Sequence, residues 1–145
     1  MNKIEHIQYD GNLLAIIIRE EHSVNGIEFF TPDEFSQQLA SMGHKKGKII
    51  APHVHNPVPR EVQFTKEILI IKSGKLRVDF YDDHQKYLES RILFKGDVIL
   101  LANGGHGFEV MEDLQMIEVK QGPYAGEKDK IRFLPVAEQN LIIKD

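Results

Sequence analysis

The most regular pattern of hydrophobic and polar positions lies in the second half of the chain. Between Lys75 and Tyr81 apolar residues alternate with charged ones, and a second alternating run extends from Tyr87 to Phe94. Side chains on a β-strand point alternately to opposite faces, so both runs predict half-buried strands. The polar stretch between them, residues 82–85, predicts a turn.

The same kind of pattern predicts strands along the rest of the chain. Asp10-Gly11 predicts the turn of a hairpin within residues 4–19. Three consecutive isoleucines, Ile16 to Ile18, suit a strand buried on both faces or covered by another subunit. Further strands are expected at 98–102, 108–111, 114–120 and 141–143. Turn signals recurring about every eight to twelve residues predict an all-β sandwich or barrel.

One short helix is expected near residue 31. Thr31 and Glu34 form a capping box around Pro32, which favours one or two helical turns. Gln37 to His44 could continue that helix, but we prefer a strand there. We expect it to pair across Lys45-Lys46-Gly47 with a strand from Lys48 to His53.

Composition limits the function classes. A chain of 145 residues with a net charge of −4 predicts one compact domain without a basic surface for nucleic acid. With no cysteine, a metal would have to be held by nitrogen and oxygen ligands. The start of the chain does not resemble a signal peptide and no apolar run could span a membrane, so a soluble cytoplasmic protein is expected.

The first candidate metal ligands are His53 and His55. Residues one apart on a strand share a face, and Ile49, Ile50, Val54 and Pro52 favour a strand over a helix here. Neutral imidazole is the commonest metal ligand in proteins, so the two side chains would form half of a site. The alternative is a pair of surface histidines without a partner.

A carboxylate follows at Glu67, where the chain enters an apolar run. If Glu61 to Ile71 is one strand, Glu61, Gln63 and Glu67 share one face. A buried carboxylate needs a cation or hydrogen-bond donors. Two histidines and one carboxylate are typical of non-haem iron sites, but Glu67 could also pair with Lys66 or Arg60.

His106 is the fourth candidate. It follows the apolar strand from Val98 to Ala102 and the turn Asn103-Gly104-Gly105, whose glycines let the backbone approach whatever the imidazole contacts. By itself this pattern also suits a hairpin in which a histidine happens to follow a turn.

These residues together resemble the motifs of a small single-domain cupin. The first cupin motif is matched by Gly47, His53, His55, Glu67 and Gly74, and the second by Gly96, Gly104 and His106. The resemblance implies a double-stranded β-helix, or jelly-roll barrel, with its core at about residues 36–120 and the terminal strands flanking it. It also implies that His53, His55, Glu67 and His106 bind one metal ion, and that two chains form a homodimer by exchanging terminal strands.

The chain departs from the cupin pattern in three places. The stretch from Asn56 to Lys66 is longer than the usual spacer, which makes Glu61 a rival ligand, although only Glu67 keeps the spacing to Gly74. Ala102 replaces a proline of the second motif and one residue, Gly105, separates Gly104 from His106. Val110 stands where the family often has asparagine.

Three functions are compatible with this site. A divalent ion (Fe, Mn, Ni, Cu or Zn) could polarise a carbonyl group, or bind oxygen if it is Fe(II). This predicts a metal-dependent isomerase, lyase or dioxygenase acting on a small polar molecule such as a sugar or keto-acid derivative. Glu61 and Gln63 are the candidate catalytic residues, and Arg60 could hold an anionic group. The alternatives are a non-catalytic binding or sensing protein and a metal-free protein resembling sugar-nucleotide epimerases.

A polar, turn-rich loop follows the last long strand. Tyr124, Asp129 and Arg132 could cap the mouth of the barrel, but we favour a loop packed on the outside.

Overall fold

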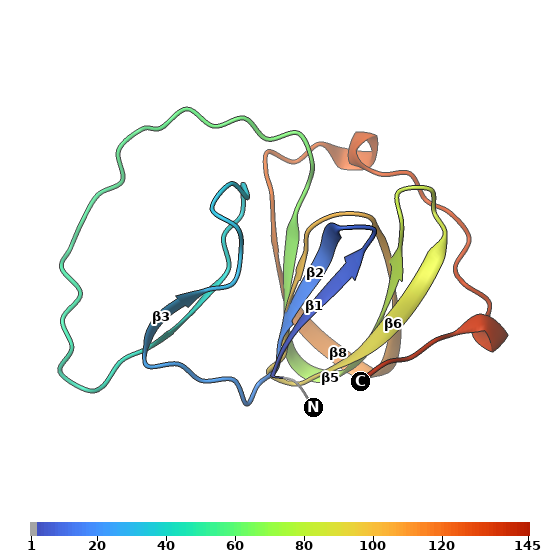
Figure 1. Cartoon of the computed structure of the whole chain (residues 1–145), viewed down its shortest axis with the longest axis horizontal. Coiled ribbons are helices and arrows are strands. Elements are labelled where there is room, and N and C mark those ends of the chain that lie inside the picture. Colours follow the sequence, from blue (N-terminus) through green and yellow to red (C-terminus); the bar gives the residue numbers. More distant parts are fainter. Residues whose placement is uncertain (1–2) are drawn as a thin grey trace. The chain divides into compact units, whose positions relative to one another are not determined.

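In a computed structural model that describes residues 3–145, the chain divides into two compact units. The sheet unit comprises the N-terminal residues as far as His22 together with Thr65–Asp145, and the hairpin unit comprises Ser23–Phe64 (Figure 1). Every candidate site residue from His53 to Gln63 falls in the hairpin unit, whereas Glu67 and His106 fall in the sheet unit.

The sheet unit is a six-stranded sheet in which all neighbouring strands are antiparallel, in the order β1-β2-β7-β5-β6, with β8 paired to β5. An all-β architecture with a strongly curled sheet is therefore confirmed. The strands are β1 (Ile4–Tyr9), β2 (Asn12–Ile18), β5 (Glu67–Tyr81), β6 (Tyr87–Phe94), β7 (Val98–Leu101) and β8 (Gly105–Lys120).

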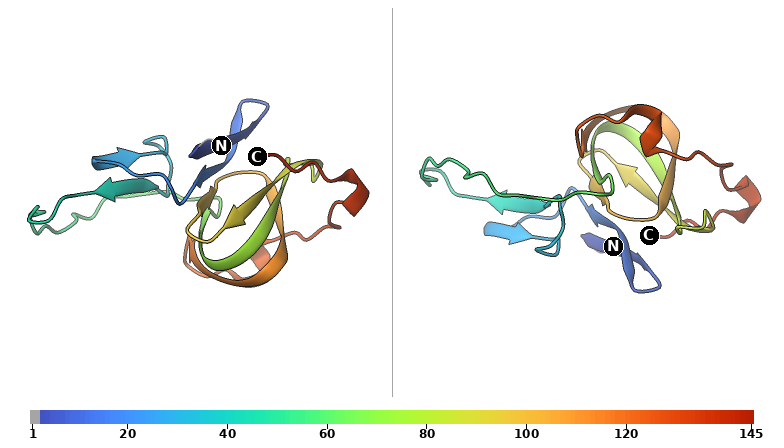
Figure 2. Two further views of the ribbon diagram at one scale, coloured as in Figure 1. Left: turned by 90° about the horizontal axis from the view of Figure 1, so that it is seen from below. Right: turned by 90° about the horizontal axis from the view of Figure 1, so that it is seen from above.

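The curl of the sheet centres on the two longest strands. β8 pairs with β5 along its whole length, while the first part of β5 also pairs with β7 and the second part with β6. The β5–β8 register shifts at several points between Ile71 and Leu76. Such bulges bend a strand and increase its twist. The ladder thus curves around the interior of the sheet unit (Figure 2).

Gly74 lies at the bend for two physical reasons. Its φ is +88°, a conformation that L-residues with side chains rarely adopt, and a Cβ atom there would lie 2.1 Å from the carbonyl oxygen of Asp113. Only glycine lets the two strands approach this closely at the bulge.

The bend also changes which positions of β5 face the core. Before it, Leu69 and Ile71 are buried in the central cluster, and after it the even-numbered Leu76, Val78 and Phe80 are. A strand without irregularities would send these two sets to opposite faces. The shifted register keeps both sets on the concave face, where they pack on residues of β1, β2 and β7, including Ile7, Ala15, Ile17, Ile99 and Leu101.

A buried ionic network joins the N-terminal hairpin to β6. Glu5 on β1 accepts hydrogen bonds from the Nε atoms of Arg19 and Arg91, both at 2.8 Å. Arg19 also donates to Asp97 and to the carbonyl oxygen of Ile92, each at 2.8 Å. Because β1 and β6 are not adjacent in the strand order, these contacts connect elements that backbone pairing leaves apart.

The C-terminal segment lies along β6 and carries two short 3₁₀ helices, η1 (Gly126–Asp129) and η2 (Glu138–Asn140). The amide of Ser90 donates to the carbonyl oxygen of Ile142 at 2.8 Å, and the amide of Lys144 donates to that of Ser90 at 3.0 Å. These bonds satisfy part of an exposed strand edge. The expected strand at 141–143 is only an isolated bridge between Ile143 and Ser90.

The hairpin unit consists of β3 (Gly26–Phe29) paired with β4 (Ala40–Gly43) and of irregular chain. The expected helix at Thr31 is wrong, because Thr31 stabilises the connection between these strands instead. Its hydroxyl donates to Gln38 Oε1 at 2.6 Å and accepts from the amide of Leu39 at 3.2 Å.

Two strand predictions need correction. β4 pairs with β3, and residues 44–66 contain no strand, so the predicted partner at Lys48–His53 is wrong. Pro52, Pro57 and Pro59 remove amide donors from this stretch, which accounts for its lack of pairing. The two strands expected at 108–111 and 114–120 are also wrong as separate strands, because β8 passes through Glu112 and Asp113 with a bulge.

Within residues 3–145 the structure contains no helix of the length and apolar character needed to cross a membrane.

We predict that Glu5→Gln lowers the free energy of unfolding by about 3 kcal/mol, because removing one partner of a buried ion pair leaves the other charge uncompensated. Glu5, Arg19 and Arg91 are all buried. Urea unfolding measures the change, with exposed Glu21→Gln as the matched control. A loss no larger than that of the control would show that the network contributes little.

Gly74→Ala and Gly11→Ala form a second matched pair. Both glycines have positive φ, but a Cβ at Gly11 meets nothing within 4 Å. Both variants should lose stability through backbone strain of about 1 kcal/mol. Gly74→Ala should lose considerably more, since its methyl group would collide with Asp113. Equal losses in thermal unfolding would contradict the close approach at the bend.

Candidate metal centre

Glu67 and His106 meet on the concave side of the curled sheet. Glu67 begins β5 and His106 is the second residue of β8, and Glu67 Oε2 lies 3.2 Å from His106 Nε2. In the ladder His106 pairs with Phe80, thirteen positions beyond Glu67 along β5. A straight strand would separate these positions by roughly 43 Å. The bend therefore brings the two ends of one ladder together.

The strand register explains why both side chains point inward. Glu67 shares its face with Leu69 and Ile71 and is buried, while the His106 side chain is 29% exposed. Two positions further along β8, the Phe108 ring lies 5.4 Å from the His106 ring. Glu67 thus lies on the buried face of β5.

Lys120 is a further member of this cluster. It is the register partner of Glu67, and its Nζ lies 3.5 Å from Glu67 Oε1 and 4.0 Å from Asp129 Oδ2. Asp129 in turn accepts a hydrogen bond of 2.6 Å from the hydroxyl of Thr65. The two oxygens of Glu67 therefore face two different nitrogen groups.

The hydrogen bond from His106 lowers the pKa of the Glu67 carboxyl, and this effect outweighs the opposing effect of burial. The nearby charge of Lys120 lowers the pKa further. Burial by itself would lower the pKa of Lys120, but attraction to Glu67, Glu118 and Asp129 raises it above its ordinary value. Glu67 is thus held as an anion, the form that binds a cation.

The pair has a geometry suited to a metal ion. Transition metals bind histidine nitrogen and carboxylate oxygen at about 2.0–2.2 Å, which places two cis ligands of an octahedral ion roughly 3 Å apart. The 3.2 Å between Oε2 and Nε2 matches this spacing. The same distance also suits a direct hydrogen bond, so this geometry allows two states of the site.

His53 and His55 form a second pair, in the hairpin unit. Their ring centroids lie 5.2 Å apart, edge to face, although the segment is not a strand. His53 Nδ1 lies 3.0 Å from the carbonyl oxygen of Ala51. A proton on Nδ1 would donate to that carbonyl and leave Nε2 as a free donor atom for a metal, an arrangement common among metal-binding histidines.

The other candidates do not share a strand face with Glu67. β5 begins at Glu67, so the prediction that the strand extends back to Glu61 and Gln63 is wrong, and both residues are exposed. The Arg60 guanidinium contacts only the carbonyl oxygen of Val58 among the described hydrogen bonds, at 3.5 Å. In the described part of the chain, no group of three or more histidine, aspartate or glutamate side chains is close enough to hold a metal.

Sequence analysis did not identify Lys120. Alternation along the predicted strand at 114–120 places Lys120 on one face with Met116 and Glu118, but only the register opposite Glu67 reveals its role. Asp129, from the loop after β8, lies 4.0 Å from Lys120.

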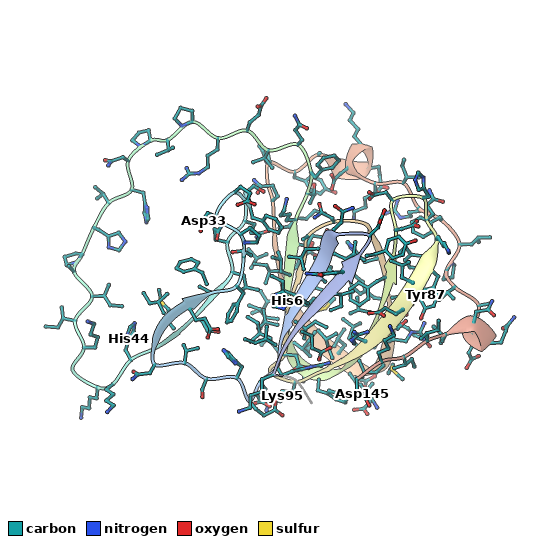
Figure 3. The ribbon with its side chains drawn as sticks, viewed as in Figure 1. His6, Asp33, His44, Tyr87, Lys95 and Asp145 are labelled. Carbon is teal, nitrogen blue, oxygen red and sulfur yellow. The ribbon has the colours of Figure 1, made fainter. Side chains whose placement is uncertain are left out.

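The two units present their side chains differently. In the sheet unit side chains crowd the space within the curled strands, whereas in the segment that follows His44 they stand apart along the chain (Figure 3). This agrees with the exposure of residues 44–64, and it makes the sheet unit the part with a preformed site.

Comparison with known proteins does not identify a family. No family model, curated protein or solved structure matches the chain. The resemblance to cupins accordingly rests on the motif residues themselves.

With divalent ions removed by a chelator, we predict that the Glu67 carboxyl titrates below the usual glutamate range. His106→Ala should raise the pKa of Glu67 more than Lys120→Met, because the hydrogen bond from His106 is the largest cause of the shift. NMR titration of the side-chain carboxyl group measures both changes.

The depressed pKa has a defined effect on stability. Glu67 contributes stability above the pKa of the unfolded chain, and this contribution is lost as the pH falls through the folded value. A Glu67 pKa that His106→Ala leaves unchanged would contradict the assigned hydrogen bond.

Proposed function

We propose that this protein is a metal-dependent enzyme of the cupin kind that acts on a small polar molecule. The reaction class is an isomerase, lyase or dioxygenase, and the ion is iron, manganese, nickel, copper or zinc. The observation that supports this proposal most is the 3.2 Å approach of Glu67 Oε2 and His106 Nε2 from opposite ends of one ladder. The jelly-roll barrel, the homodimer and the cytoplasmic location belong to the same proposal.

In this proposal Glu67 and His106 would both hold the ion. Their donor set, one carboxylate and one imidazole, suits first-row transition metals. His53 and His55, in the hairpin unit, stay predictions as the two further ligands that the cupin motif implies. When bound, the ion would polarise a carbonyl group of the substrate.

Lys120 has a defined part in this proposal. Its ammonium group competes with a metal for Glu67, since each cation satisfies the same carboxylate. Asp129, 4.0 Å from Nζ, provides a second acceptor to which Lys120 can turn when an ion occupies Glu67. Lys120 would then lie beside the open metal positions and could donate a hydrogen bond to substrate. Glu61 and Gln63 stay predictions as substrate-contacting residues.

A second candidate is a metal-free protein. Both oxygens of Glu67 already have nitrogen partners, His106 and Lys120, so the cluster is satisfied without an ion. A histidine oriented by a carboxylate can act as a general base, as the epimerase-like alternative requires. A non-catalytic binding protein would keep the same cluster for ligand contacts alone.

Metal affinity distinguishes these candidates. The chelated protein should bind at least one of the five ions when each is added back in an isothermal titration. Glu67→Gln and His106→Ala should each weaken binding by more than about a hundredfold, because the loss of an outer-shell partner already costs about ten- to a hundredfold. His53→Ala should also reduce both metal content and turnover.

The matched control is His84→Ala, which removes an exposed histidine from the turn before β6. It should leave affinity unchanged. Wild-type protein that binds none of the five ions, yet is stabilised against heat by a substrate candidate, would overturn the metal-dependent proposal and favour the metal-free one.

A further inference from the structure

A small pocket in the sheet unit adjoins the Glu67–His106 pair. Its volume is about 150 Å³, and its lining includes Thr65, Lys120, Gln121, Pro123, Tyr124 and Asp129. Lys120 connects the two features, since it lines the pocket and lies 3.5 Å from Glu67. A molecule in the pocket would therefore lie next to the candidate metal ligands.

The pocket has one charged hydrogen-bond donor, the Lys120 ammonium group, and one charged acceptor, the Asp129 carboxylate. Lys120 Nζ and Asp129 Oδ2 lie 4.0 Å apart. A hydroxyl group can accept from the ammonium and donate to the carboxylate at once, whereas a ligand carboxylate can only accept and would face Asp129. Charge-assisted hydrogen bonds of this kind are stronger than neutral ones. The pocket thus favours hydroxyl groups.

The charge balance leads to the same conclusion. Lys120 lies between Glu67 and Asp129, so one ammonium group faces two carboxylates. Without a metal ion these three groups carry a net charge of −1, and in that state they disfavour an anionic ligand such as a keto acid. A neutral polyhydroxylated molecule avoids the repulsion.

The remaining wall supplies apolar contact. Pro123 and Tyr124 line the pocket, and Tyr124 is 88% exposed. An exposed aromatic ring offers a broad apolar surface with one polar tip, which suits the C–H face of a sugar ring. The Tyr124 ring is not packed in the protein interior, so it is free to contact a ligand in the pocket.

Size restricts the ligand further. Sites for drug-sized molecules usually have volumes of about 300–1,000 Å³. At about 150 Å³ this pocket holds a single ring and not a nucleotide as well.

We propose that the pocket binds one uncharged sugar ring through its hydroxyl groups, with Lys120 and Asp129 as the polar contacts and Tyr124 against the ring face. The role of the sugar as a substrate rests on the proposed function. The inference then assigns sugars as the substrate class of the same site. It favours the sugar over the keto-acid derivative.

The test uses the full chain and NMR. Free D-glucose, D-galactose, D-mannose, L-rhamnose and L-fucose are added singly to labelled protein, with pyruvate and α-ketoglutarate as anionic comparisons. We expect at least one sugar to shift the amide signals of residues 121, 122 and 124–126, and neither acid to do so.

Variants then test the assigned contacts. Asp129→Asn should weaken the binding of that sugar by roughly ten- to a hundredfold, as expected when a hydrogen bond to a charged group is lost. Tyr124→Ala should weaken it at least about tenfold. Asp83→Asn and Tyr9→Ala, at exposed positions in the turn before β6 and at the end of β1, are the matched controls and should bind the sugar as wild type does.

The inference is overturned if no sugar shifts these signals, if an acid shifts them instead, or if the controls weaken binding as much as the pocket variants. Metal titration of the same samples separates this failure from that of the proposed function. Metal binding without sugar binding overturns the sugar pocket alone. Sugar binding without any metal affinity overturns the metal-dependent function and leaves the pocket in place.

Discussion

The bend in the β5–β8 ladder is the constraint on which the candidate site depends. It requires the positive φ of Gly74 and the close approach of Asp113. It also keeps Leu69 and Leu76 on one face, although an odd-numbered and an even-numbered position of a regular strand would face opposite sides. The same bend brings Glu67 within hydrogen-bond distance of His106. Core packing and the candidate metal centre are therefore two results of one distortion in backbone pairing.

A carboxylate on the buried face of a sheet needs a cation, and the choice of cation decides what this site can do. His106 and Lys120 satisfy Glu67 in the absence of any ion. A divalent ion carries twice the charge of an ammonium group and, in the proposed function, would bind both Glu67 and His106 at short range and displace Lys120. Lys120 would then move toward Asp129, between the metal and the neighbouring pocket. Competition between Lys120 and a divalent ion for Glu67 would thus connect the proposed metal-dependent reaction with sugar binding in the neighbouring pocket.

Sequence patterns predicted the regular part of the fold well because alternation reports burial directly. The N-terminal hairpin, the strands on either side of residues 82–85 and the inward face of Glu67 all followed from it. The same reasoning failed at Thr31, where a side chain bonds across a hairpin connection, and at residues 44–66, where three prolines interrupt pairing. It also missed Lys120, because its role depends on the register opposite Glu67, which no local pattern contains. Glu67 and His106 were both predicted as site residues. Their close approach could not be predicted, because it depends on the bend in the β5–β8 ladder.

The most direct test of the central claim is an anomalous scattering map from crystals of the metal-reconstituted protein. The account predicts one peak within about 2.2 Å of both Glu67 Oε2 and His106 Nε2, with the Lys120 ammonium moved away from Glu67. A map without a peak at this position, with Lys120 still bound to Glu67, would contradict it.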